Sequence, residues 1–250
     1  MPRILVTNDD GYFSPGIEAL AAALRAIGEV IVVAPLTEAS AVGHALTLRR
    51  PLRIQKMGEA VYAVDGTPTD CVNIAIDQIM TEPPDIVVSG INTGLNVGDD
   101  VTYSGTVAGA FEAALLGFAG IAVSLERPSM EFGPGAEVAA KFAALVLEHG
   151  LPSRTFLNIN VPKGEIRGIK ATVQAARNHI TKVDRRLDPR QRPYFWIEEA
   201  QDDWAPHDRS DRQAIKDGYV SVTPLQPDLT DHKSIDLVEQ LTKRIVSGVR

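Results

Sequence analysis

An α/β fold with a mostly parallel sheet is what the sequence predicts, and three observations support it. Short runs rich in β-branched residues alternate along much of the chain with segments of helical apolar spacing, the order of parallel strands joined by helices. Some runs are continuously apolar, as strands buried on both faces are. After about residue 162 the pattern gives way to charge, proline and isolated β-rich segments. We therefore expect a doubly wound, Rossmann-like sheet with an extended C-terminal β-arm.

The core is predicted over residues 1–162, where strands and helices alternate. Apolar residues spaced i, i+3, i+4 predict the helices, and short apolar runs predict the strands. Segments 46–57 and 60–64 alternate and predict a hairpin or edge strands, and Thr67 or Thr69 would cap the helix that follows. The predicted strands are 3–7, 30–34, 85–90, 121–125 and 155–161, and the predicted helices are 17–27, 72–79, 106–116 and 136–147.

Residues 163–250 are predicted to belong to the same functional unit. Segments 169–173, 194–197 and 219–223 are strand-like, so we interpret the charged stretch 177–215 as an extended β-arm rather than a disordered tail. Apolar residues at helical spacing over 235–246 predict a closing amphipathic helix. This second region therefore consists of an arm, one more core strand and a C-terminal helix.

Composition excludes several classes of protein. The chain has 250 residues, is 44% hydrophobic and carries a formal net charge of −7, which argues against stable nucleic-acid binding because that needs a basic face. The single cysteine, Cys71, allows neither a disulfide framework nor a cysteine-based zinc site within the chain, and we expect it to be buried. No apolar run approaches the ~20 residues of a membrane span, and the N-terminus has no signal-peptide pattern. We expect a cytoplasmic protein.

Asn8-Asp9-Asp10-Gly11 closes the first predicted strand and is the feature around which the fold is organised. A turn requires one aspartate, and two adjacent carboxylates repel each other unless a cation or a proton separates them. Carboxylate oxygens suit Mg²⁺ or Mn²⁺. Asp9 and Asp10 are therefore candidate metal ligands, with a cap or turn role as the alternative.

Two further loops follow predicted strands in the same way. The loop after 30–34 offers Ser40, and the loop after 85–90 offers Asn92, whose neutral oxygens would complete a carboxylate site without adding charge. Each would ordinarily be a loop hydrogen-bonder, and only their convergence on one sheet edge favours ligation. His44, in the Ser40 loop, could contact substrate, although a surface or packing role is the more common one. Glu112, on an apolar helix, is expected to pair rather than to catalyse.

Tyr103-Ser104-Gly105-Thr106 precedes the predicted helix 106–116 and indicates an anion site. Free backbone N–H groups and the positive end of the helix favour an anion there, and the hydroxyls add donors. The alternative is an ordinary Ser/Thr N-cap. No Gly-Lys-Ser/Thr follows and no GxGxxG follows the first strand, so an NTPase or a dehydrogenase is disfavoured.

Five motifs occur in order along the chain: Asn8-Asp9-Asp10-Gly11 with Pro15-Gly16, Ser40, Gly66-Thr67-Pro68-Thr69-Asp70-Cys71, Ser89-Gly90-Ile91-Asn92 and Tyr103-Ser104-Gly105-Thr106-Val107. Together they resemble the SurE survival-protein nucleotidases, and the resemblance extends over essentially the whole chain. It continues through Asp188-Pro189-Arg190, Tyr194-Phe195-Trp196 and the run from Gly218 to Leu225. The sequence departs from the pattern at Ala41, where glycine is common after the loop serine, and at Ser14, where alanine is common.

The resemblance implies a metal-dependent phosphohydrolase acting on nucleoside 5′- and 3′-monophosphates, and in some members on short polyphosphate. It further implies a homodimer or homotetramer that exchanges the arm between subunits. By that likeness one divalent ion would be held by Asp9, Asp10, Ser40 and Asn92, and the phosphate would face Asn96, Ser104, Gly105 and Thr106.

The mechanistic hypothesis is attack of a metal-activated water on phosphorus, with no obligatory phosphorylated protein intermediate. Asp9 or Asp10 could instead be a nucleophile, as acids are in some phosphatases. Two rival functions remain open. One is a non-catalytic nucleotide-sensing or RNA-associated binding protein that uses the same pocket, and the other is a general phosphomonoesterase acting on non-nucleotide esters.

Overall fold

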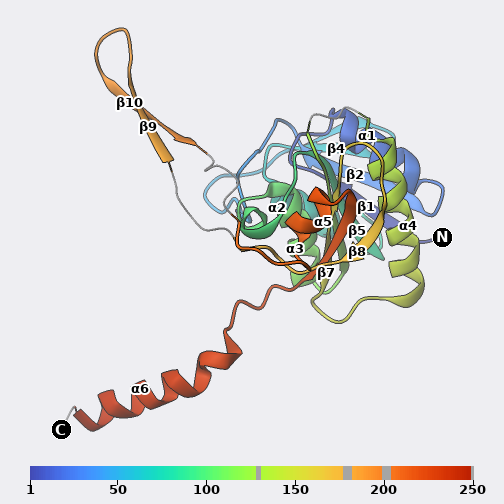
Figure 1. The fold of residues 1–250 in the computed structure, drawn as a ribbon. Helices are drawn as coiled ribbons and strands as arrows, with labels where there is room; N and C mark the ends of the chain where they lie inside the picture. The colour runs from blue at the N-terminus through green and yellow to red at the C-terminus, as the bar shows by residue number, and fades with distance from the viewer. Residues whose placement is uncertain (128–130, 177–181, 199–203, 249–250) are drawn as a thin grey trace.

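The computed structural model confirms the α/β fold and its doubly wound sheet (Figure 1). It describes residues 1–127, 131–176, 182–198 and 204–248. One nine-stranded sheet has the order β3-β4-β2-β1-β5-β6-β7-β11-β8. Its strands are β1 (Arg3–Thr7), β2 (Glu29–Pro35), β3 (Ile54–Gly58), β4 (Val61–Val64), β5 (Ile86–Thr93), β6 (Ala119–Leu125), β7 (Phe156–Val161), β8 (Gly168–Ala171) and β11 (Tyr219–Leu225).

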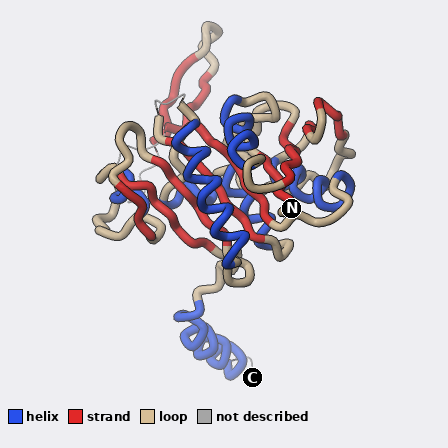
Figure 2. The backbone as a smooth tube through the Cα atoms, turned by 90° about the vertical axis from the view of Figure 1, so that its right-hand side faces the viewer, coloured by secondary structure: helices blue, strands red, loops and turns tan. Residues whose placement is uncertain are grey.

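The helices cover both faces of this sheet. On one face α1 packs against α4, and on the other α2 packs against α3; Figure 2 shows the long helix α4 lying across the strands. The helices of the core are α1 (Pro15–Leu24), α2 (Pro68–Ile74) with a π-helical turn at Ala75–Ile79, a 3₁₀ turn at Gly98–Thr102, α3 (Gly105–Leu115), α4 (Gly133–His149) and α5 (Asp211–Lys216).

The central strands form the core because their side chains are apolar on both faces. Ile4, Leu5 and Val6 of β1 are fully buried, and so are Val87 and Val88 of β5. Parallel strands sandwiched between two helical layers require such continuous apolar runs. The core therefore holds β1 and β5 side by side, with Thr7 opposite Ser89 in the parallel register.

The strand order reverses between β1 and β5. The chain leaves β1 through α1 to β2 on one side, and β5 then returns to pair with the other side of β1. In open α/β sheets the crevice beyond the carboxyl ends of the strands at such a switch point is where ligands bind. The loops after β1 and β5 start at this crevice.

Some boundaries differ from the sequence-based expectation. Residues 46–53 were predicted as strand, but they are a loop. The start of this loop bonds to the N-terminus of α2, where Asp70 accepts from the backbone N–H of Thr47 (2.8 Å), and its end bonds to Asp65, just after β4. The predicted hairpin is confined to β3 and β4, which pair antiparallel at the edge of the sheet. The short helix α5 was not predicted at all. Thr67, one of the two proposed caps, is the N-cap of α2 in a capping box with Asp70.

The C-terminal region separates into a part that completes the sheet and two parts that project from it. Strands β8 and β11 join the main sheet, β11 antiparallel to β7. Strands β9 (Lys182–Leu187) and β10 (Pro193–Glu198) pair antiparallel with each other in a two-stranded sheet, the predicted β-arm. The predicted closing helix is α6 (Ile235–Gly248), which follows the 3₁₀ turn His232–Ser234 and stands away from the core at the opposite end from the arm (Figure 1). Across the described residues, no helix combines the length and the apolar character that crossing a membrane would take.

Candidate functional site

Asn8 shapes the loop that presents the two aspartates. Its side chain is fully buried, donates to the carbonyl of Gly11 (3.0 Å) and accepts from the Gly11 N–H (3.2 Å). It also donates to the hydroxyl of Ser14 (2.8 Å), which is the N-cap of α1. Gly11 has φ +96°, a conformation that glycine adopts without strain. The loop is therefore a closed local structure, which fixes where Asp9 and Asp10 lie.

Asp9 lies directly against the N-terminus of α3. The Thr106 hydroxyl donates a hydrogen bond to Asp9 Oδ1, and the Thr106 backbone N–H also favours the ionised form of this carboxylate. A Cβ added at Gly105 would lie 2.7 Å from the Asp9 Cβ, so only glycine allows this approach. Three predicted residues, Asp9, Gly105 and Thr106, are thus brought together. Burial nevertheless raises the pKa of Asp9 above its ordinary value, because the bonds from Thr106 do not offset the lost hydration.

Asp10 lies in a net negative field, which Arg127 offsets only in part. Burial, then Asp9 and then Glu38 raise the pKa of Asp10 to about 6, and Arg127 opposes this shift. Neither Glu38 nor Arg127 was among the predicted site residues. Both follow predicted strands, in the loops after β2 and β6, so the sheet-edge argument applied to every strand would have found them. The carboxylates gathered here are what a divalent cation would neutralise.

Ser40 belongs to a loop that is pinned to the first one. The N–H of Ala39 donates to the carbonyl of Asp9 (2.8 Å), which brings the second loop beside the aspartates. The Ser40 hydroxyl is exposed and donates to Glu38 Oε1 (2.5 Å). Ala41, which follows, has φ +55°, the left-handed region that glycine favours. A glycine at this place would therefore adopt the same conformation without strain.

Asn92 ends β5 at the same edge of the sheet. Because Ser89 pairs with Thr7, Asn92 and Asp10 each lie three residues beyond that pair. The half-buried Asn92 side chain donates to the Gly94 carbonyl (2.8 Å), a bond that uses its amide nitrogen and leaves its oxygen as the donor atom for a cation. Arg127 donates to the carbonyl of Thr93 (2.7 Å) and so holds the same turn from β6.

Asn96 is held by residues at the ends of β6 and β7. Its backbone N–H donates to Asn160 (2.8 Å), its carbonyl accepts from Asn158 (2.7 Å) and Asn160 (3.0 Å), and its side chain donates to Ser124 (2.8 Å). All of these side chains are buried. This clamp was not predicted, and it fixes the loop that leads to α3. Ser104, at the end of that loop, is the N-cap of α3 and accepts from the Val107 N–H (3.1 Å).

His44 is engaged with α3 rather than standing free in the loop. Its Nε2 lies 2.6 Å from Glu112 Oε2, and its ring packs on Phe111 with centroids 4.6 Å apart. Asn73 donates to the other oxygen of Glu112 (2.6 Å). Burial favours the neutral form of Glu112, but the hydrogen bonds from His44 and Asn73 outweigh it and lower the pKa. The expectation that Glu112 pairs is confirmed.

The donor set suits a hard divalent ion. The predicted ligands would supply two carboxylates, a hydroxyl and an amide oxygen, and oxygen donors are what Mg²⁺ and Mn²⁺ take. Within the part of the chain that the structure describes, no three His, Cys, Asp or Glu side chains are grouped to hold a metal. The predicted set needs two carboxylates, which the Ser40 hydroxyl and the Asn92 amide oxygen would complete. Cys71 is buried and free, and burial raises the pKa of its thiol, which makes it inert.

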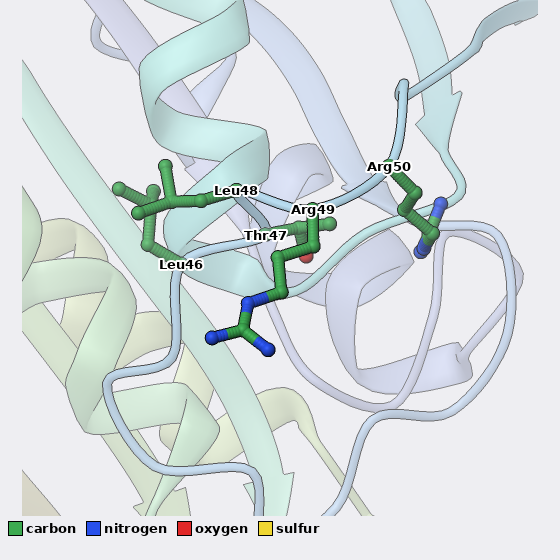
Figure 3. A pocket seen from close by; sticks show the side chains of 5 residues that line it. All are labelled: Leu46, Thr47, Leu48, Arg49 and Arg50. Carbon is green, nitrogen blue, oxygen red and sulfur yellow. The ribbon is translucent and has the colours of Figure 1, made fainter.

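A separate surface pocket of about 510 Å³ lies along the loop after the Ser40 turn (Figure 3). Arg50 is bound to Asp65, with 3.4 Å between Nη1 and Oδ2. None of the lining residues belongs to the predicted site. They are Leu46, Thr47, Leu48, Arg49 and Arg50.

Fold and site together define a class: a doubly wound α/β protein with an oxygen-rich, acidic site at the switch point of its sheet, next to a helix N-terminus. The family model described as Survival protein SurE matches residues 4–181. The chain therefore belongs to the SurE family.

Relatives in this family match the chain over nearly its full length. A protein of Syntrophotalea carbinolica named 5′-nucleotidase SurE is 50% identical over 240 residues, covering 95% of this chain and 96% of the relative. A protein of Aquifex aeolicus with the same name is 45% identical over 247 residues, covering 96% and 98%. The crystal structure of the SurE protein from Aquifex aeolicus superposes with a TM-score of 0.87 at 44% identity, covering 96% of this chain and all of that one.

Proposed function

We propose that this protein is a phosphohydrolase that removes phosphate from nucleoside 5′-monophosphates, and also from 3′-monophosphates and short polyphosphate. Relatives named 5′-nucleotidase SurE, 45–50% identical over nearly the whole chain, support the first activity. The observation that carries the proposal is the placement of Asp9 against the N-terminus of α3, with Asp10 next to it in the same loop. This contact supports a site in which metal ligands and a phosphate cradle are neighbours.

Asp9, Asp10, Ser40 and Asn92 would hold one divalent ion, Mg²⁺ or Mn²⁺. Such an ion, when bound, supplies positive charge beside the phosphoryl group and an activated water for attack on phosphorus. The raised pKa of Asp10 supports the assignment, because burial and the neighbouring acids outweigh the opposing charge of Arg127 and disfavour the ionised carboxylate. Glu38 adds to the negative field and orients the Ser40 hydroxyl.

The other proposed roles belong to the chain's own groups. The N-terminal turn of α3, from Ser104 to Thr106, faces the substrate phosphate, and its N–H groups stabilise charge that spreads over the transferring group. Thr106 also orients Asp9 through the hydroxyl bond, which keeps the carboxylate at the helix end. Asn96, fixed by Asn158 and Asn160, sets the position of the loop that meets the substrate.

The direct test is phosphate release from AMP with Mn²⁺ or Mg²⁺, compared with the same protein in EDTA. We expect release that requires the metal, and release from 3′-AMP and tripolyphosphate at lower rates. No release with any metal would contradict the proposal and favour a non-catalytic nucleotide-binding protein. Comparable or faster turnover of p-nitrophenyl phosphate would favour a general phosphomonoesterase.

The projecting elements support a homodimer or homotetramer as the working form. Helix α6 carries Leu237, Val238, Leu241 and Ile245 on one face, and each is exposed in the single chain. A 14-residue helix is marginal in water unless its apolar face is packed. We propose that a second copy of the chain covers this face, and that the arm β9–β10 contacts another subunit.

A further inference from the structure

The loop that joins β5 to α3 is tied to the C-terminal region at Gly98. The Gly98 N–H donates to Asp211 Oδ2 (2.9 Å), and its carbonyl accepts from the Gln174 side chain (2.9 Å). Both backbone polar groups of this one residue are therefore bound by residues more than 70 positions away in the chain. The loop is thus clamped at two places, since Asn96 is held independently by β6 and β7.

The packing at Gly98 leaves no room for a side chain. A Cβ there would lie 2.7 Å from the carbonyl oxygen of Ala175 and would overlap the ring of Trp204. Gly98 also has φ +54°, which glycine adopts without steric cost. The loop backbone and the C-terminal region are therefore in direct contact, and Asp211 is the charged group at that contact.

Asp211 is fully buried and connects the loop to the chain segment that contains Ala175. Its Oδ1 accepts from the N–H of Ala175 (3.0 Å) and of Arg212 (2.7 Å), while Oδ2 accepts from Gly98. Burial raises the pKa of Asp211, although these backbone bonds oppose the shift. A buried carboxylate is costly unless hydrogen-bond donors surround it. One oxygen of Asp211 binds the loop at Gly98, and the other binds the chain segment at Ala175.

These contacts lie at the base of the projecting arm. Ala175 and Ala176 precede β9 in the chain, and Trp204 and Ala205 follow β10. The Ala205 N–H donates to the Ala176 carbonyl (2.9 Å), which joins the two segments. The loop that leads to α3 therefore rests on the base of the β9–β10 hairpin.

We propose that Asp211 is a positioning residue for substrate binding: by tying Gly98 to the base of the arm, it fixes the loop that carries Asn96 and Ser104. This inference rests on the proposed nucleotidase function, because it assigns that loop to the substrate phosphate. Asp211 itself touches no reacting atom. Because Thr106 stays bound to Asp9 when Asp211 is lost, the first turn of α3 keeps its place and the loop before it loosens. Binding in the ground and transition states should then weaken alike, which raises KM and leaves kcat nearly unchanged.

The test compares Asp211→Asn with Asp217→Asn. Asparagine keeps the shape of Asp211 but has one acceptor oxygen, so its NH₂ must face the N–H of either Gly98 or Ala175. Asp217 is a matched control because it ends the same helix, is partly exposed and bonds to Gln213 and Lys170, away from the loop. The measurements are KM and kcat for AMP and hydrogen–deuterium exchange of peptides covering 94–104.

We expect Asp211→Asn to raise KM about tenfold, with kcat within about twofold, and to speed exchange of the loop, whereas Asp217→Asn does neither. A KM equal to that of the control would overturn the inference, whether or not exchange rises. If the wild-type protein releases no phosphate, the proposed function is wrong, and the clamp is judged by exchange alone. In that case, loop exchange in Asp211→Asn as slow as in the wild type would contradict the clamp at Gly98.

A second variant keeps the test decisive if Asp211→Asn fails to fold. Gln174 is an exposed residue, and Gln174→Ala removes only its side-chain bond to the Gly98 carbonyl. We expect KM to rise about threefold and loop exchange to increase, because one of the two ties is lost. An unchanged KM in this folded variant would overturn the inference.

Discussion

Around the candidate site the apolar residues of β1 are fully buried, whereas on the arm Phe195 and Trp196 are 59% and 57% exposed, and Ile197 is 78% exposed. The two regions also differ in how their backbones are paired. Strand β1 has a partner on each side, while β9 and β10, among the strands that the structure describes, pair only with each other. A two-stranded ribbon is marginally stable by itself in water.

The two regions differ in the kind of requirement that the single chain leaves unmet. At the sheet edge, the unmet requirement is electrostatic, since burial and the charges of Asp9 and Glu38 raise the pKa of Asp10 to about 6. On the arm and α6 the unmet requirement is hydrophobic, since large side chains face solvent. The site requires a cation, whereas the arm and α6 require another subunit. Substitutions can therefore disrupt the site and the subunit contact separately.

The largest expected effect is on the site. Asp9→Asn should lower phosphate release from AMP by about 10³-fold or more. The substitution removes a negative charge that helps to hold the ion, and the ion in turn stabilises the transition state. Asn has nearly the same shape, so the unfolding temperature should stay near the wild-type value. Asp77→Asn, an acid on the π-helical turn after α2, is the control. Retained turnover in Asp9→Asn would count against the site.

Next comes the apolar face of α6. The double substitution Leu237→Glu with Leu241→Glu should weaken association at least about 100-fold, because burying two carboxylates in an apolar contact is costly. Light scattering should then give a smaller mass than that of the wild-type assembly. Lys243→Glu adds a similar charge on the opposite face of the helix and should leave the assembly intact. An unchanged mass in the double variant would show that this face is not the contact.

A smaller effect is expected at Glu112, inside the core. Its lowered pKa means that the ionised form is favoured by folding, so its contribution is present above about pH 4.5 and is lost as the pH falls through the lower folded-state pKa. Glu112→Gln should reduce the free energy of unfolding at pH 7 by about 1–3 kcal/mol. In urea titrations the difference from wild type should shrink towards pH 4. A constant difference would contradict the assigned charge.

The smallest effect is expected at Ala41. Its φ of +55° carries a steric cost that glycine avoids, while glycine also adds freedom to the unfolded chain. Ala41→Gly should therefore raise the free energy of unfolding by up to about 1 kcal/mol, with turnover close to wild type. Ala45→Gly, in the same loop, is a control that should not stabilise. A destabilised Ala41→Gly protein would show that the loop is not strained there.

The sequence predicted what local patterns determine. Continuous apolar runs located the central strands, and Ser104 and Thr67 marked helix starts that the structure confirms. What it could not supply depends on contacts between distant segments. Nothing near Asp211 or Asn160 in sequence indicates that each holds the same loop, and residues 46–53 have β-like alternation but bond to α2 instead. Part of the predicted arm, at 177–181 and 199–203, lies outside the described residues.

We propose that Asp9, Asp10, Ser40 and Asn92 together hold one divalent ion. Titration of Mn²⁺ followed by electron paramagnetic resonance tests it without relying on turnover. The account predicts one tight site per chain in the wild-type protein, lost in Asp9→Asn and weakened in Asn92→Ala. Equal Mn²⁺ binding by the wild-type protein and Asp9→Asn would contradict it.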